Sequence, residues 1–147
     1  MRHEVSQDPQ RFRAEVLALN NDNTPHVNAL SAQALDALIA QAASFRVMTN
    51  QDKALSGFVL LLREGQAYES LNYRWFSETF ETFLYVDRII VAPHCRGAGV
   101  AQALYDHATA LAQAMALDSD SGSEPASAME MVPETGAGLE LALGRVR

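Results

Sequence analysis

The sequence VAPHCRGAGVAQALYDHATALAQ, residues 91–113, is the part of the chain that departs most clearly from ordinary globular sequence. It joins a strand-like run, YVDRIIV (residues 85–91), to a long amphipathic helix through a turn that contains Pro93, Gly97 and Gly99. The N-terminus of a helix presents free amide N–H groups and a partial positive charge, and glycines let the backbone curl around an anion. The stretch therefore predicts a turn that binds a phosphate group.

Two common phosphate-binding motifs do not fit this turn. The P-loop requires a Gly-Lys pair, and the chain contains none. The dinucleotide fingerprint Gly-x-Gly-x-x-Gly/Ala, when started at Gly97, ends on Gln102. That fingerprint also follows the first strand of a βαβ unit, whereas this turn follows two predicted helices, a hairpin and a long connector. We therefore expect a different phosphate ligand.

Composition limits the class of protein. The chain has 147 residues, of which 48% are hydrophobic and 20% charged, as in a single soluble globular domain. Its net charge of −7 argues against binding to nucleic acid or to an anionic membrane. A single cysteine, Cys95, excludes a multi-cysteine zinc site, and we expect no metal. With no membrane-length apolar run and no leader-like start, the expected location is the cytoplasm.

Hydrophobic spacing predicts an order of elements along the chain. It predicts two helices, at residues 10–20 and 31–44, and then an antiparallel hairpin of strands 45–49 and 55–63. An aromatic-rich connector, residues 65–83, leads to a long strand at 83–91 and a long helix at 99–117. The connector has two interpretations. Its rings pack over the edge of the sheet, form one wall of a binding cleft, or do both.

The sequence changes character after Leu117. Residues 118–125 are linker-like, and only residues 139–143 could form a short strand or helical turn. We therefore predict one domain over residues 1–117 and an atypical, poorly ordered tail over residues 118–147. The tail is either a natural divergent end or the product of a truncation or replacement such as a frameshift. The abrupt loss of aromatic residues and of strand pattern favours the second interpretation.

The turn carries a resemblance to a known family. The run Arg96-Gly97-Ala98-Gly99-Val100-Ala101 resembles the Gln/Arg-x-x-Gly-x-Gly/Ala signature of the GNAT superfamily of N-acetyltransferases. The preceding REGQAYESLNYRWF, residues 63–76, is similar to a bacterial subgroup of predicted acetyltransferases. The resemblance implies an α+β fold with a mixed, mostly antiparallel sheet flanked by helices. In this chain we expect the C-terminal part of that fold to be incomplete.

The resemblance also implies a function. Members of the family transfer the acetyl group of acetyl-CoA to a primary amine, here of unknown identity. The pantetheine arm of the cofactor would lie along the strand, and its pyrophosphate would lie on the turn. The implied cofactor-binding residues are Ile89, Ile90, Val91, Arg96, Gly97, Ala98, Gly99, Val100, Ala101 and Gln102.

Transfer to an amine requires a base that takes up the amine proton and a donor for the leaving thiolate. Asp87 and Glu81 are the candidates for the base, although Asp87 could equally pair with Arg88, and Glu81 could simply be solvated. Tyr85, together with Tyr73, is a candidate for lining the acceptor pocket. We expect His94 and Cys95 to be structural, because they lie beside the phosphate turn.

A GNAT fold normally continues with a parallel strand and a further helix after the phosphate-binding helix. If these are missing, the strand at residues 83–91 has an exposed edge, which favours pairing with another chain and hence a homodimer. The alternative to an active enzyme is a degenerate, non-catalytic module that binds CoA or a partner.

Overall fold

A computed structural model of the chain describes residues 2–24, 27–118, 128–133 and 139–146, with side chains described only up to residue 115. Its centre is a six-stranded sheet in the order β1-β2-β3-β4-β6-β5, and every neighbouring pair of these strands is antiparallel. The strands are β1 (His3–Val5), β2 (Ser44–Asn50), β3 (Leu55–Arg63), β4 (Phe80–Val91), β5 (Ala128–Pro133) and β6 (Leu139–Val146). The helices are α1 (Arg13–Asp22), α2 (Ala32–Gln41), α3 (Leu71–Thr79) and α4 (Val100–Asp118), with 3-10 turns at Pro9–Phe12 and Pro93–Cys95.

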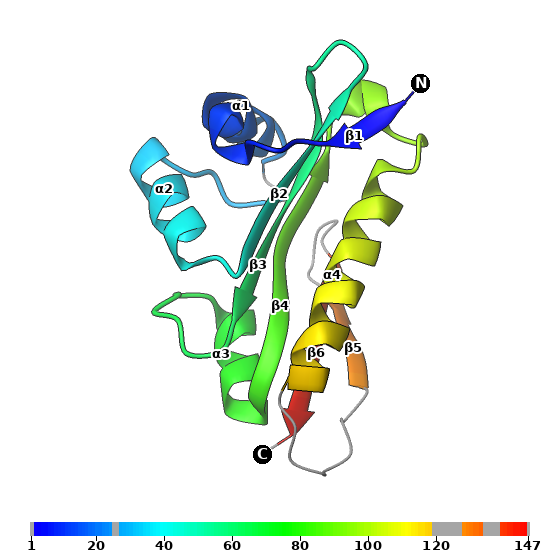
Figure 1. Cartoon of the computed structure of the whole chain (residues 1–147). Helices are drawn as coiled ribbons and strands as arrows, with labels where there is room; N and C mark the ends of the chain where they lie inside the picture. Colours follow the sequence, from blue (N-terminus) through cyan, green and yellow to red (C-terminus); the bar gives the residue numbers. More distant parts are fainter. Residues whose placement is uncertain (1, 25–26, 119–127, 134–138, 147) are drawn as a thin grey trace.

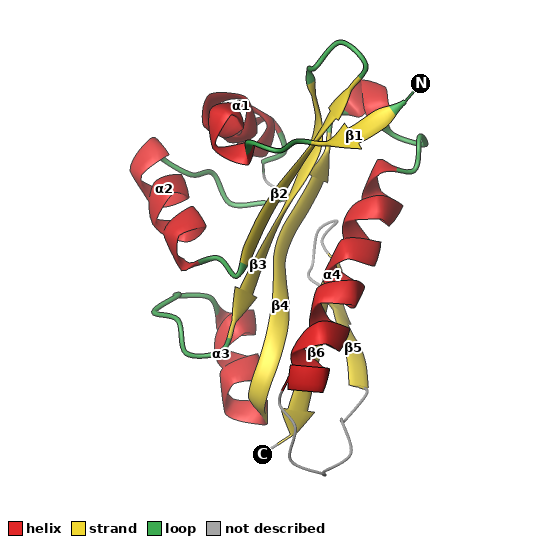
Figure 2. Cartoon of the chain, viewed as in Figure 1, coloured by secondary structure: helices red, strands yellow, loops and turns green. Residues whose placement is uncertain are grey.

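The helices cover both faces of the sheet. Helices α1, α2 and α3 lie on one face, and α4 runs along the other (Figure 1; Figure 2). Ser31 caps the N-terminus of α2, because the Ala34 N–H donates to Ser31 Oγ at 3.0 Å. Within the described part of the chain, no helix combines the length and the apolar character that a membrane span needs. The α+β class with a sheet flanked by helices is confirmed, but the described strands include no parallel pair, so the expectation of a mixed sheet was wrong for this part of the chain.

Strand β3 is the centre of the core, and its residues 57–62 are apolar throughout. It pairs with β2 on one side and β4 on the other, and both of its faces are covered by helices. The apolar and aromatic side chains of β3 and β4 that are at most 2% exposed are Phe58, Val59, Leu60, Leu61, Leu62, Phe80, Phe83, Leu84, Tyr85 and Val86.

The aromatic connector packs its rings onto the sheet. It contains α3, whose Ser70 cap accepts from the Tyr73 N–H at 3.3 Å. The Tyr73 and Phe76 rings lie against Phe83, with ring centroids 5.4 and 6.0 Å apart. The Tyr73 hydroxyl is also occupied, since it donates to the Arg63 carbonyl at 2.6 Å. The packing interpretation of these rings is therefore confirmed.

The segment after α4 differs from the sequence prediction. Where the sequence predicts a poorly ordered tail, the structure has β5 and β6, and β6 is longer than the predicted strand at residues 139–143. Strand β6 pairs with β4 from Phe80 to Tyr85, so the prediction of an exposed edge was wrong for this half of β4. The cause is backbone pairing, which does not need a strong side-chain pattern. The pairing with β6 also covers part of the β4 edge from which a homodimer was inferred. The division at residue 117 remains a prediction.

We predict that Gly57→Ala destabilises the fold. A β-carbon at this position of β3 would lie 2.8 Å from the Ile90 carbonyl oxygen and 3.0 Å from Val100 Cγ1. Both neighbours belong to packed elements, so the overlap should cost about 1–3 kcal/mol. The measurement is the midpoint of urea unfolding, and an unchanged midpoint would show that α4 can shift away without cost.

Candidate functional site

The turn between β4 and α4 is shaped by two glycines in the left-handed conformation. After β4 ends at Val91, a 3-10 turn leads to residues 96–99, and α4 begins at Val100. The φ angles of Gly97 and Gly99 are +80° and +82°, and a β-carbon on either would meet no atom within 4 Å. Residues with a side chain rarely adopt such angles, so glycine is needed to form this turn.

The turn presents a row of free amide N–H groups. Within the described residues, the N–H groups of residues 97–102 have no hydrogen-bond acceptor, and the Ala103 N–H is the first to donate, to the Gly99 carbonyl at 3.0 Å. Such groups, together with the positive end of the helix dipole, bind phosphate oxygens in proteins. The open space beside the glycines leaves room for the anion to approach. These residues therefore fit the pyrophosphate of a cofactor.

The turn is held firmly against β3. The Ala92 N–H donates to the Ser56 carbonyl at 2.8 Å, and Gly57 lies directly beneath Val100. Cys95 is 1% exposed, which agrees with the structural role expected for it. This anchoring fixes where the free N–H groups point.

Arg96 lies exposed at the rim of the turn. Its Nη2 donates to Asn23 Oδ1 at 3.4 Å, so the turn lies close to the C-terminal end of α1. An exposed hydrogen bond of this length is weak, and the guanidinium can exchange it for a stronger phosphate contact.

The second half of β4 has one open edge in the described part of the structure. Pairing with β6 ends at Tyr85, whereas pairing with β3 continues to Val91. Ile89 and Val91 are half-buried, and Ile90 is buried. On the side away from β3, the predicted cofactor-binding strand therefore has no strand partner among the described residues from Val86 to Val91, and this edge leads directly to the phosphate turn.

A β-bulge in this open half is centred on Asp87. Leu60 pairs with Arg88 and Leu61 with Val86, which leaves Asp87 as the extra residue. The Asp87 and Arg88 side chains are only 3% and 6% exposed, and their Oδ2 and Nε atoms lie 2.6 Å apart. The pairing of Asp87 with Arg88, which the sequence left open as an alternative to a catalytic role, is therefore present.

The half-buried Tyr68 completes this group, and sequence reasoning did not single it out. Its hydroxyl donates to Asp87 Oδ1. Burial, together with the charge of Asp87, raises the pKa of Tyr68 well above its ordinary value. Burial lowers the pKa of Arg88, but the neighbouring Asp87 carboxylate outweighs this and raises it. Both groups therefore keep their protons at neutral pH. The only sequence signal for Tyr68 was its place in the aromatic connector.

The other predicted catalytic residues do not join this group. Tyr85 is 1% exposed and packs against Tyr73 and Phe76, with ring centroids 5.5 Å away in each case. Glu81 is exposed near the beginning of β4, roughly 20 Å from Asp87 at the rise of an extended strand. The structure thus brings Asp87 together with Tyr68 and Arg88, but not with Glu81.

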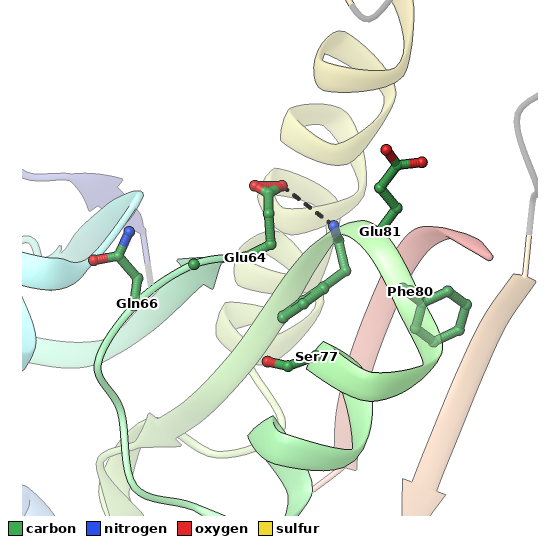
Figure 3. A pocket seen from close by; sticks show the side chains of 7 residues that line it. Glu64, Gln66, Ser77, Phe80 and Glu81 are labelled. Carbon is green, nitrogen blue, oxygen red and sulfur yellow. Dashed lines mark hydrogen bonds between the residues drawn. The ribbon is translucent and has the colours of Figure 1, made fainter. Parts of the chain in front are cut away.

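Glu81 instead lines a small cavity where α3 meets β4. The cavity has a volume of about 290 Å³ and is lined by Glu64, Gly65, Gln66, Ser77, Phe80, Glu81 and Phe83. The Glu64 carboxylate accepts from the Phe83 N–H at 3.4 Å, and the Glu81 carboxylate points away from it (Figure 3). Glu81 and Val91 are about 33 Å apart along the strand, so this cavity is separate from the phosphate turn.

A sequence model of the acetyltransferase (GNAT) family matches residues 13–128, which include the turn, the open strand edge and the bulge. The chain belongs to the GNAT family. The family predicted from the Arg96–Ala101 signature is therefore confirmed, whereas the bacterial subgroup stays a prediction. No curated protein matches the sequence significantly.

Solved acetyltransferase structures share the GNAT fold at low sequence identity. Naa20 of Chaetomium thermophilum, in complex with a bisubstrate analogue, has a TM-score of 0.55 and 14% identity over 99% of this chain and 87% of its own. A Trypanosoma brucei acetyltransferase has a TM-score of 0.51 and 17% identity, over 77% of this chain and 75% of its own. The glucosamine N-acetyltransferase region of a fungal multi-domain GH3 β-N-acetylglucosaminidase has a TM-score of 0.53 and 15% sequence identity. That match covers 74% of this chain but only 12% of the fungal protein. These similarities concern the fold alone.

We predict that Asp87→Asn destabilises this GNAT protein, while Glu81→Gln does not. The first change leaves the buried Arg88 guanidinium without a charged partner, which should cost about 3 kcal/mol. The second changes an exposed carboxylate and should stay within about 0.5 kcal/mol. Urea unfolding of both variants measures the difference. Equal stabilities of the two variants would mean that the Asp87–Arg88 pair does not contribute to the stability of the fold.

Proposed function

We propose that the protein is an acetyl-CoA-dependent N-acetyltransferase that acts on a primary amine. The observation that carries the proposal is the row of free N–H groups at residues 97–102, which continues from the open edge of β4 in a member of the GNAT family. A basic acceptor would also suit the net charge of −7.

Each part of the site has a role in binding acetyl-CoA, which supplies the acetyl group as an activated thioester. The backbone of residues 97–102 would hold the pyrophosphate, with Arg96 adding a positive charge at the rim. The unpaired backbone of Ile89, Ile90 and Val91 would pair with the pantetheine arm as a further strand would. The arm would then lead from the turn toward the bulge at Asp87.

Proton transfer is supported unequally by the three candidate residues. Asp87 has the best position, because the bulge lies in the open half of β4, but its carboxylate is enclosed by Arg88 and Tyr68. Glu81 is exposed but distant, and the Tyr85 ring is buried. A water molecule at the open edge can also accept the amine proton.

The enclosure of Asp87 and Tyr85 favours one alternative, a module that binds CoA without catalysis. The two functions differ in their behaviour toward amines. Calorimetry with CoA and acetyl-CoA tests binding, and release of free thiol in the presence of a panel of amines tests transfer. Binding of both ligands without thiol release would favour the module, and absence of binding would exclude both functions.

We predict that Ala98→Glu weakens CoA binding at least tenfold, because it places a carboxylate on the turn that would receive the pyrophosphate. Ala98 has an ordinary negative φ, so the change avoids the strain that a side chain at Gly99 would introduce. The matched control is Ala110→Glu, which adds the same charge at an exposed position of α4. Equal affinities of the two variants for CoA, measured by calorimetry, would contradict a phosphate site at this turn.

A further inference from the structure

The buried arginine of β4 is bonded to helix α1 as well as to its neighbour in the strand. Arg88 Nη1 donates to Asn20 Oδ1 at 2.7 Å, in addition to the contact between Nε and Asp87. Asn20 is 0% exposed. Side chains of consecutive strand residues normally point to opposite faces, and the bulge lets Asp87 and Arg88 contact each other in the core.

Asn20 passes this connection to the backbone that precedes α2. Its Nδ2 donates to the Asn28 carbonyl at 3.0 Å and to Asn21 Oδ1 at 3.1 Å. Asn21 in turn accepts from the Leu30 N–H at 2.9 Å and donates to the Leu30 carbonyl at 3.0 Å. The side chains Tyr68, Asp87, Arg88, Asn20 and Asn21, which we call the polar chain, thus join the connector before α3, the bulge and the segment before α2.

Stability alone does not explain a polar chain at this place. A buried ion pair pays a desolvation cost, and apolar side chains of similar volume often stabilise a core equally well or better. The polar chain does, however, fix the geometry of the bulge at Asp87, which is the irregular part of the open edge of β4. Because a bulge has no regular pairing to define it, its backbone orientation depends on the side chains that hold it.

We propose that Arg88 and Asn20 are positioning residues of the cofactor site: together they hold the bulge at Asp87 so that the edge of β4 can bind the pantetheine arm. This inference rests on the proposed function. The nucleotide end of the cofactor should not depend on the polar chain, because the turn is anchored separately through Ser56, Ala92 and Gly57.

The test separates the arm from the nucleotide. Calorimetry measures the Kd of CoA and that of adenosine 3′-phosphate 5′-diphosphate, the nucleotide end of CoA without its arm. In Asn20→Ala, Arg88 loses its second acceptor. The Kd for CoA should then rise about tenfold, while the Kd for the nucleotide changes less than about twofold.

A conservative variant distinguishes positioning from a purely structural role. Asn20→Asp keeps the acceptor for Arg88 but loses the donor to the Asn28 carbonyl, so it should lower stability and yet keep the ratio of the two Kd values. Asn28→Ala removes an exposed side chain and leaves its carbonyl, so it should change neither. If Asn20→Ala does not fold, Arg88→Lys replaces it. A lysine can still pair with Asp87 but cannot also reach Asn20, so it should show the same selective loss of CoA affinity.

The outcomes are distinct. If the wild-type protein binds neither ligand, the proposed function fails, and this inference fails with it. If the wild-type protein binds both ligands but Asn20→Ala, or Arg88→Lys in its place, keeps the wild-type ratio of Kd values, only the positioning role is overturned. An equal change in the ratio of the two Kd values in Asn20→Ala and Asn20→Asp would also overturn the positioning role, because the change would then reflect the lower stability that both variants share.

Discussion

The close approach of α4 to the β3–β4 pair is the constraint on which the rest of the structure depends. Gly57 has no side chain, and this lets Val100 and the Ile90 carbonyl come together above it. The N-terminus of α4 is thereby placed at the end of β4, and the preceding turn is held over the sheet. With a larger residue at this point the helix would stand farther away, and its free N–H groups would no longer continue the line of the strand edge.

A second constraint comes from the polar chain inside an otherwise apolar fold. Hydrophobic packing is nondirectional and tolerates small shifts, whereas the contacts of Arg88 with Asp87 and Asn20 require defined distances and angles. The apolar side chains of β3 and the rings of Tyr73, Phe76 and Phe83 therefore provide most of the buried apolar surface. The polar contacts determine the register at the bulge. The two kinds of interaction meet in β4, which is the longest strand of the described structure.

Much of the fold followed from sequence because periodic, local signals specify it. The uninterrupted apolar run of β3, the Ser31 cap and the amphipathic α4 are all encoded in neighbouring residues, as are the glycines at 97 and 99. The contacts of Asn20 and Tyr68 were not predictable in this way. They join residues far apart in sequence, and neither residue stands in a local pattern that indicates a buried polar contact.

Strands β5 and β6 were missed for a related reason. Their sequence contains no aromatic residue, and β6 gains its place through backbone pairing with β4. The alternation that is the usual signal for a strand is confined to residues 139–144, where leucines alternate with Glu140, Ala142 and Gly144. The bulge at Asp87 has no local signature either, because it is defined by the register of two strands rather than by one residue.

The pairing of β4 with β6 has a consequence for the order in which the chain folds. The partner of Phe80 is Val146, so this contact closes a long loop that contains the whole of α4. On the ribosome, strands β1 to β4 and α4 are synthesised before β6, and contacts of such sequence separation form late and slowly. During that interval the first half of β4, flanked by the rings of Phe80 and Phe83, lacks its neighbour. Nascent chains are therefore most exposed to intermolecular strand exchange at a point distant from the phosphate turn, after the helix that carries the turn has already been made.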